Sequence, residues 1–345
     1  MTESLKIALV LTASTGGIGR HVASLTPRFA AAGHRVRVYA PETTARAHGF
    51  AGADVRPPAE LRRLSGADVL HAHGYKAGGL AVPVRLLRRT PLVVSWHNAV
   101  LGLDRQAAAA RLLQRFVARG ADLTLGASSD LVQQARWCGA RNARLGPVAA
   151  PALAAPTGDR DAVRAALGFG PDRLLVLTVS RLAPQKNLGM LLDVAAEVRA
   201  DVRLGFVVVG DGPERNALQD RIDAERLPVA LVGSRNDVPD LLAAADVALL
   251  TSTWEARALV AQEALLAGVP LIATKVGGVP ELVGDGAVLV RSGDAPAAAR
   301  ALRHLAELPF LRAELAARGR AEAAAWPDED AVAADVLAAY HSVLR

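Results

Sequence analysis

Short apolar runs alternate with helix-like stretches along the whole chain of 345 residues, and this alternation restricts the fold more than any other feature. Strands separated by helices in this way pair into parallel sheets of the α/β class. Many runs are continuous Val and Leu, as expected where helices cover both faces of a sheet. The predicted strands are 6–11, 35–39, 69–71, 92–96 and 123–126 in the first half, and 174–179, 203–209, 229–232, 247–250, 270–273 and 287–290 in the second.

The length fits two domains, since one domain usually takes about 100–200 residues. We expect a first domain over 1–150 and a second over 151–326. The segment 146–159, GPVAAPALAAPTGD, contains three prolines and no periodicity, so it is predicted to be a linker. A last helix is expected within 327–345, after the helix-breaking pair Trp326-Pro327.

The net charge of +6 is unevenly distributed. Residues 1–150 hold 20 Lys and Arg against 8 Asp and Glu, whereas the remainder holds 20 against 26. The first half is therefore expected to meet an anionic partner. We do not expect that partner to be nucleic acid, because the basic half lacks interleaved aromatic residues and any known nucleic-acid-binding module.

The cysteine content and the hydropathy exclude several classes of protein. A single cysteine, Cys138, allows no internal disulfide and no cysteine metal cluster. Residues 1–11 are predicted to form the first strand rather than a signal peptide, because no charged lead precedes a long apolar run. No window reaches the roughly 18 apolar residues of a membrane span. We therefore expect a cytoplasmic protein.

A glycine-rich segment, STGGIG at 14–19, follows the first predicted strand and leads into a helix. Gly16 and Gly17 let the backbone approach a ligand closely, and a helix N-terminus favours an anion. A dinucleotide-binding domain would show G-x-G-x-x-G and an acidic residue at the end of the second strand. The spacing here is G-G-x-G and that strand ends at Tyr39, which disfavours an NAD(P)-dependent oxidoreductase.

Two loops of the second half combine charge with turn residues. In SRLAPQKN at 180–187, Arg181 and Lys186 follow a buried strand, where two cations suit a diphosphate. In VVVGDGPE at 207–214, the turn containing Gly210 and Asp211 is expected to form a wall of the same site.

The segment STWEARALVAQEAL at 252–265 carries two glutamates eight residues apart. Glu255 is expected just before a helix and Glu263 about two turns into it, a rise of about 12 Å for eight helical residues. The amides near Leu259 and Val260 would begin that helix and face a diphosphate. The two carboxylates would then accept hydroxyls at either end of a nucleotide sugar. A further glycine turn, KVGGVPEL at 275–282, precedes another helix.

Three histidines stand at the predicted carboxyl ends of neighbouring strands, His71 and His73 after one and His97 after the next. We expect them to line a polar ligand site. A three-histidine metal site is the less favoured alternative, because no carboxylate ligand stands near them in the sequence.

Together these segments resemble the retaining GT-B glycosyltransferases of family 4, and the resemblance runs over nearly the whole chain, from STGGIGRH to VGGVPELV. It implies two Rossmann-like, doubly wound α/β domains that face each other across a cleft. The nucleotide would bind the second domain and the acceptor mainly the first. The terminal segment 327–345 would cross back onto the first domain.

The resemblance also implies roles for single residues and no cofactor or metal. Arg181 and Lys186 would hold the diphosphate, Glu263 the ribose, and Glu255 the transferred sugar. The implied catalytic residues are Arg181, Lys186, Glu255 and His97, and the implied donor-binding residues are Gly16, Gly17, Gly210, Asp211, Leu259, Val260 and Glu263. The usual Gly-Phe-Gly-Leu is replaced by ARAL at 256–259, and Asn-Gly-Val by GPV at 146–148, which bears on donor identity.

The function predicted from the sequence is transfer of a UDP- or GDP-linked sugar, with retention, to a saccharide, glycolipid or small-molecule acceptor. A non-catalytic nucleotide-sugar binding protein is the alternative. Arg111, Arg115 and Arg119 recur every four residues beside Leu112 and Phe116, a pattern that suits an anionic membrane surface or a solvated helix face.

Overall fold

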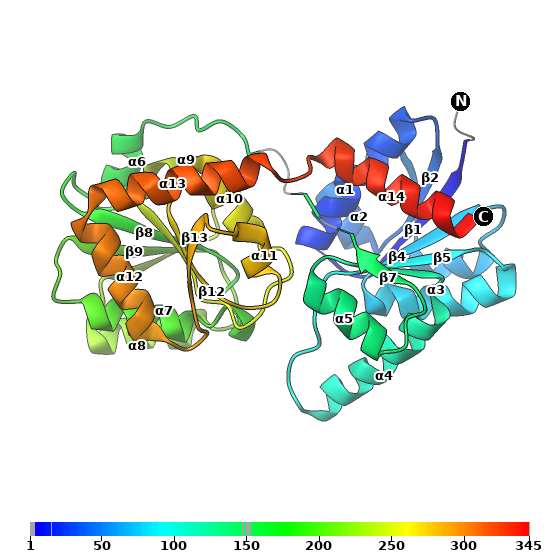
Figure 1. Ribbon diagram of the computed structural model, residues 1–345, viewed down its shortest axis with the longest axis horizontal. Coiled ribbons are helices and arrows are strands. Elements are labelled where there is room, and N and C mark those ends of the chain that lie inside the picture. The colour runs from blue at the N-terminus through cyan, green and yellow to red at the C-terminus, as the bar shows by residue number, and fades with distance from the viewer. Residues whose placement is uncertain (1–3, 15, 147, 150–152, 345) are drawn as a thin grey trace. The chain divides into compact units, whose positions relative to one another are not determined.

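The computed structural model describes residues 4–14, 16–146, 148–149 and 153–344. The chain divides into two compact units (Figure 1). Unit 1 comprises Met1–Pro151 and Pro327–Arg345, and unit 2 comprises Ala152–Trp326. The segment 146–159, predicted to be a linker, lies partly outside the described residues.

Unit 1 contains a seven-stranded parallel sheet in the order β3-β2-β1-β4-β5-β6-β7. Its strands are β1 Lys6–Leu11, β2 Arg35–Tyr39, β3 Ala53–Arg56, β4 Val69–His73, β5 Leu92–Trp96, β6 Leu123–Gly126 and β7 Ala143–Leu145. Its helices are α1 Gly17–Ala31, α2 Glu42–His48, η1 Pro58–Arg63, α3 Tyr75–Arg88, α4 Arg105–Gly120, α5 Ser129–Trp137 and α14 Glu329–Leu344.

Unit 2 contains a six-stranded parallel sheet in the order β10-β9-β8-β11-β12-β13. Its strands are β8 Leu174–Val179, β9 Leu204–Val209, β10 Val229–Gly233, β11 Val247–Leu250, β12 Leu271–Thr274 and β13 Ala287–Val290. Its helices are α6 Arg160–Ala166, η2 Pro184–Lys186, α7 Leu188–Val198, α8 Arg215–Glu225, α9 Val238–Ala244, α10 Leu259–Ala267, α11 Val279–Val283, α12 Ala295–Glu307 and α13 Pro309–Ala324.

The strand order determines where each sheet can hold a ligand. In unit 1 the order reverses between β1 and β4, and in unit 2 between β8 and β11. The loops on either side of such a reversal leave toward opposite faces of the sheet, so a crevice opens outside the carboxyl ends of the strands. The segments singled out from the sequence follow these strands or the strands directly beside them.

Burial on both faces explains why the strands of unit 2 are continuously apolar. Alternate side chains of β8 belong to two separate cores, with Val176 packing beside α7 and Leu175 and Leu177 beside α9 and α10. All six residues of β9 are buried. Helices therefore cover both faces of the sheet, as the Val and Leu runs predict.

Helix α14 completes the core of unit 1, although it lies almost two hundred residues after β7 in the chain. Val336 and Tyr340 pack in the same core cluster as β1 and α1. The ring of Tyr340 lies edge-on to Phe29 at 5.8 Å, and its hydroxyl lies 2.7 Å from His71 Nδ1. This bond gives a buried phenol and a buried imidazole a partner each, which burial requires.

Each strand predicted from the sequence is present, with ends that differ by at most two residues. The sequence missed β3 and β7, which are the two edge strands of unit 1. Three of the four residues of β3 are exposed, and β7 has only three residues, so neither carries a continuous apolar run. Among the described residues, no helix is both long and apolar enough to cross a membrane.

The substitution Tyr340→Phe is expected to lower the free energy of unfolding by about 1–3 kcal/mol, because it leaves His71 Nδ1 buried without its partner. Chemical denaturation of the full chain measures the change. Tyr75→Phe on α3 is the matched control, since Tyr75 is only half-buried, and its effect should stay within about 0.5 kcal/mol. Equal unfolding midpoints for the two variants would contradict the assigned role of Tyr340.

Candidate functional site

The candidate site of unit 2 is built from four loops that follow β8, β9, β11 and β12. Backbone hydrogen bonds join these loops in pairs: Leu182 N to Asp211 O at 3.0 Å, Thr253 N to Gln185 O at 2.8 Å, and Gly278 N to Glu255 O at 2.8 Å. Because each loop is bonded to another and follows a strand of the sheet, the positions of its side chains are fixed by the sheet and by these bonds.

Two glycines allow these loops to approach so closely. Gly210 has a φ of +132°, and a Cβ there would lie 1.9 Å from the carbonyl oxygen of Ser180. Gly277 has a φ of +50°, and its Cβ would lie 2.0 Å from the carbonyl oxygen of Glu255. Any larger residue would force the loops apart, so glycine is required at both positions for packing as well as for conformation.

Lys186 and Glu255 form an ion pair at the centre of this site. Lys186 ends η2 after β8, Glu255 follows β11, and Lys186 Nζ lies 2.5 Å from Glu255 Oε1. Ser252 Oγ donates to the same carboxylate oxygen at 2.7 Å. Glu255 is buried, whereas about a fifth of the Lys186 side chain is exposed. The pair thus carries a buried carboxylate whose cation still reaches solvent.

Arg181 supplies a second cation on the same loop as Lys186. Its side chain is exposed and makes no ion pair with any of the residues described. Asp211, on the loop bonded to it, is also exposed and accepts from Gly212 N at 2.7 Å. The hydroxyl of Ser180 is buried and has no hydrogen-bond partner within the described part of the chain. An exposed guanidinium beside an unsatisfied hydroxyl suits an anionic, oxygen-rich ligand.

The first turn of α10 offers backbone amides to the same site. The helix begins at Leu259, its N-cap Ala258 makes no side-chain cap bond, and its first turn has no acidic residue. The amides of Leu259 and Val260 therefore lie at a helix N-terminus without an anionic side chain in that turn, where the helix dipole favours a bound anion.

The prediction that Glu263 lies two turns into a helix is wrong. Residues 255–258 are not helical, so Glu263 lies about one turn into α10. The carbonyl of Glu255 is bonded to Gly278 and that of Trp254 accepts from Gln185 Nε2 at 2.7 Å, which holds this segment out of the helix. The rise of eight helical residues therefore does not measure the separation of the two glutamates.

Arg257, in the segment before α10, is a third cation of this part of unit 2, after Arg181 and Lys186. Burial lowers the pKa of its guanidinium, and the nearby Glu281 carboxylate partly offsets that effect. Arg257 is half-buried between Ala256 and Ala258, which are both buried. The loop that carries Glu255 thus also carries a shielded positive charge, whose nearby carboxylate is Glu281.

The glycine-rich segment of unit 1 is held by α2. Ser14 N donates to Thr44 Oγ1 at 3.0 Å, and His48 Nε2 lies 3.1 Å from the carbonyl oxygen of Ser14. A Cβ on Gly19 would overlap the His48 ring at 2.1 Å, so this glycine makes room for a side chain of the protein itself. Gly16 and Gly17 are exposed at the start of α1, and no atom lies within 4 Å of a Cβ built on Gly16.

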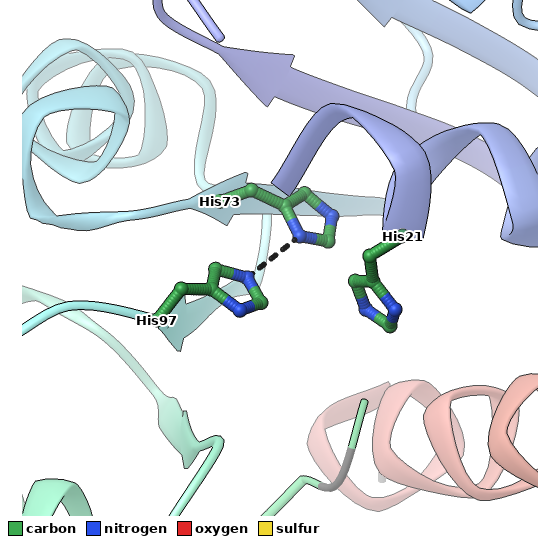
Figure 2. A group of neighbouring side chains, drawn as sticks. All are labelled: His21, His73 and His97. Atoms are coloured by element: carbon green, nitrogen blue, oxygen red, sulfur yellow. Dashed lines mark hydrogen bonds between the residues drawn. The ribbon is translucent and has the colours of Figure 1, made fainter. Parts of the chain in front are cut away.

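The histidines of unit 1 group differently from the prediction. His71 is fully buried and uses both ring nitrogens internally, Nδ1 with Tyr340 Oη at 2.7 Å and Nε2 with Ser95 Oγ at 2.8 Å. It therefore does not line a ligand site, and the prediction that it does is wrong. His21 on α1 takes its place beside His73 and His97 (Figure 2).

These three rings are buried and uncharged at neutral pH. Burial lowers the pKa of His21 to about 4 and holds the pKa values of His73 and His97 well below the usual range. His73 Nδ1 lies 3.4 Å from His97 Nε2. No sequence pattern signalled His21, because its helix meets the ends of β4 and β5 only in the folded chain.

The residues predicted for one site therefore fall into two groups. Unit 1 holds Gly16, Gly17 and His97, while unit 2 holds Arg181, Lys186, Gly210, Asp211, Glu255, Leu259, Val260 and Glu263. Within unit 2 the structure brings Lys186 and Glu255 into direct contact. The loop that carries Lys186 is also bonded to the loop that carries Gly210 and Asp211.

Comparison with known proteins identifies related sequences for both units. Residues 159–322 match the family described as glycosyl transferases group 1, and residues 16–151 match the glycosyl transferase 4-like domain. The D-inositol 3-phosphate glycosyltransferase of Streptomyces avermitilis is 31% identical over 304 residues, covering 79% of this chain and 65% of the relative. The alpha-D-kanosaminyltransferase of Streptomyces kanamyceticus is 31% identical over 281 residues, covering 74% and 72%.

Solved structures share the fold. HepE from Anabaena, in complex with UDP-glucose, superposes with a TM-score of 0.85 at 22% identity, covering 98% of this chain and all of HepE. Sucrose-phosphate synthase from Thermosynechococcus elongatus gives a TM-score of 0.83 at 22% identity, covering 98% of each chain. These likenesses establish the GT-B type of α/β fold. The chain spans just under two thirds of the length of the Streptomyces avermitilis relative.

A double-mutant cycle on Lys186→Met and Glu255→Gln is expected to show a coupling of about 1–3 kcal/mol in the free energy of unfolding. Lys186→Met leaves the buried Glu255 carboxylate without its cation, which is costly, although solvent reaching Lys186 reduces the loss. Chemical denaturation of the four proteins measures the coupling. Arg199→Ala, which removes an exposed cation beyond α7, should change stability by less than about 0.5 kcal/mol. Additive effects of the two substitutions would contradict the pairing.

Proposed function

Because the chain belongs to the group 1 glycosyl transferases, the family 4 enzymes of GT-B fold, we propose that it transfers a sugar from a nucleoside diphosphate sugar to an acceptor. The observation that carries the proposal is the site at the carboxyl ends of β8 and β11. There the Lys186–Glu255 pair, the exposed Arg181 and the N-terminus of α10 belong to the two loops after β8 and β11, which are bonded to each other and to the loops after β9 and β12. Cations with amides suit a diphosphate, and carboxylates suit sugar hydroxyls.

In the proposed reaction the bond between the anomeric carbon and the diphosphate oxygen breaks, and a bond from that carbon to the acceptor oxygen forms. Arg181, Lys186 and the first amides of α10 would stabilise the charge that develops on the leaving diphosphate. The acceptor proton would pass to an oxygen of the departing phosphate, on the face from which the acceptor attacks. The anomeric configuration would then be retained. Side-chain cations and helix amides would neutralise the diphosphate, so the scheme uses no metal ion.

The ion pair in the free protein gives this scheme a specific consequence. When a diphosphate binds, Lys186 would share its charge between Glu255 and the diphosphate. Glu255 would still accept the hydrogen bond that Ser252 donates. Glu255 would then be free to accept a hydroxyl of the transferred sugar, and Glu263, one turn into α10, to accept those of the ribose. The solved complex of HepE contains UDP-glucose, which favours a UDP-linked donor here over a GDP-linked one.

We expect His97, Gly16 and Gly17 of unit 1 to contribute to donor binding as well, as the family resemblance implies. His97 would offer a neutral imidazole as a hydrogen-bond partner, because burial keeps its pKa well below neutrality. Gly16 and Gly17 would bring exposed amides at the start of α1, where no side chain caps the helix.

For the acceptor we propose a lipid-linked saccharide at the anionic inner face of a membrane. Helix α4 presents the apolar side chains of Leu112 and Phe116 to solvent, 66% and 48% exposed, beside the exposed Arg115 and Arg119. Leu103, before the helix, is 93% exposed. Exposed apolar side chains among arginines suit insertion at an anionic lipid surface better than plain solvation.

Lys186→Ala and Glu263→Ala are expected to reduce turnover of a UDP-sugar by about 100- to 1000-fold, because each removes a group that stabilises or positions the diphosphate sugar. Release of UDP in the presence of donor measures turnover, and a thermal-shift screen of UDP-, GDP- and ADP-sugars selects the donor. Arg199→Ala should retain turnover. Binding of the donor without any turnover by the unmodified chain would instead indicate a nucleotide-sugar binding protein.

The paired substitution Leu112→Ser with Phe116→Ser is expected to reduce binding to vesicles that contain phosphatidylglycerol by about tenfold, since each side chain would bury apolar area in the membrane. Sedimentation with vesicles measures the bound fraction, and neutral vesicles should bind poorly. Phe310→Ser is the matched control, because Phe310 on α13 of unit 2 is also exposed, at 62%. If Phe310→Ser weakens binding as much, the α4 surface is not the membrane contact.

A further inference from the structure

The group formed by His21, His73 and His97 brings three imidazoles together inside unit 1 (Figure 2). His21 lies on α1, His73 ends β4, and His97 directly follows β5. One ring nitrogen of each lies within 4.8 Å of the corresponding nitrogens of the others. Each residue is at least nine-tenths buried, so none of the three rings is a solvated surface histidine.

The distance between His73 and His97 distinguishes two kinds of contact. His73 Nδ1 and His97 Nε2 are 3.4 Å apart. A hydrogen bond from a nitrogen donor is usually about 2.7–3.2 Å long, so this contact is long for one. Two nitrogens that bind the same tetrahedral ion at about 2.0–2.1 Å lie about 3.3–3.4 Å apart. The pair therefore has the spacing of two ligands of one ion.

The hydrogen bonds around the group show which histidines can take part. Both nitrogens of His71 are occupied by Tyr340 and Ser95, so His71 has no lone pair to offer, although its ring lies only 4.1 Å from that of His73. By contrast, His73 Nε2 is buried and has no hydrogen-bond partner among the described residues. This nitrogen points away from Nδ1, the atom spaced for an ion, so it would carry the ring proton and leave the Nδ1 lone pair for the ion.

The chemistry of the side chains decides the class of ion. A neutral imidazole offers one nitrogen lone pair to a metal ion. The group contains no carboxylate, which Mg²⁺ and Ca²⁺ would need. Imidazole ligands suit Zn²⁺, Co²⁺, Ni²⁺ and Cu²⁺. Sites of three histidines with a fourth position for water are a known arrangement for Zn²⁺.

We propose that His21, His73 and His97 together bind one divalent transition-metal ion, with Zn²⁺ or Co²⁺ in tetrahedral coordination. His73 and His97 already have the required separation, and His21, whose ligand nitrogen lies within 4.8 Å of theirs, needs to approach them by at most about 1.5 Å for the three nitrogens to meet one ion at normal distances. The site lies within unit 1 and shares His97 with the proposed donor contact. An ion would take His97 Nε2, which faces His73, and would leave Nδ1 for the donor.

Titration of the full chain with Co²⁺, without nucleotide and without a histidine tag, tests the proposal. We expect one equivalent to bind, with the intense visible absorption of tetrahedral Co²⁺, and Zn²⁺ to displace it. His21→Gln should weaken Co²⁺ binding by more than about 100-fold, since loss of even an outer-sphere partner costs about 10- to 100-fold. His341→Gln is the matched control, because His341 lies on α14 of the same unit and outside the group.

Circular dichroism and the melting temperature of the metal-free proteins show whether each variant folds. If His21→Gln does not fold, His97→Gln replaces it, because His97 is the most exposed of the three. The absence of a one-equivalent visible spectrum, or equal loss of binding in His341→Gln, would overturn the proposal. Transfer activity is not the readout, so failure here and failure of the proposed function remain distinguishable.

Discussion

The contact between Lys186 and Glu255 is the interaction on which the candidate site of unit 2 depends. It joins the loop after β8 to the loop after β11, the two strands between which the sheet reverses its order. A carboxylate as buried as Glu255 is stable only with a cation and hydrogen-bond donors close by, and Lys186 and Ser252 supply them. The pair holds the two loops together and keeps a positive charge at the solvent side.

The parallel sheets explain why chemistry gathers where it does. In each unit the central strands end at the same edge, and their loops carry polar residues that the buried strands cannot. In unit 2 this edge collects Arg181, the ion pair and the amides of α10. In unit 1 the corresponding edge collects buried imidazoles, which are neutral because they have been withdrawn from water.

The sequence predicted what depends on local pattern. Continuous Val and Leu runs located the central strands, but the edge strands β3 and β7 lack such runs because one side of an edge strand has no neighbour to bury it. The loop residues Arg181, Lys186 and Glu255 were singled out by charge at strand ends, and the structure shows two of them in contact. The family resemblance, which the comparisons confirm, added the expected chemistry.

What the sequence did not predict depends on tertiary contacts. His21 meets His73 and His97 only because α1 packs over the ends of β4 and β5, and His71 is withdrawn from them by Tyr340 of α14, far along the chain. The start of α10 at Leu259 follows from bonds between loops rather than from helix propensity. Gly210 likewise has no side chain because the carbonyl oxygen of Ser180 lies against it. A turn pattern in the sequence does not predict that contact.

A crystal structure of the chain with UDP tests the central claim most directly. The account predicts that the diphosphate lies within hydrogen-bonding distance of Lys186 Nζ and the first amides of α10, with Arg181 turned toward it and the ribose hydroxyls at Glu263. If the diphosphate instead bound away from the Lys186–Glu255 pair, with that ion pair and its four loops untouched by the ligand, the assignment of this site to a nucleoside diphosphate sugar would be contradicted.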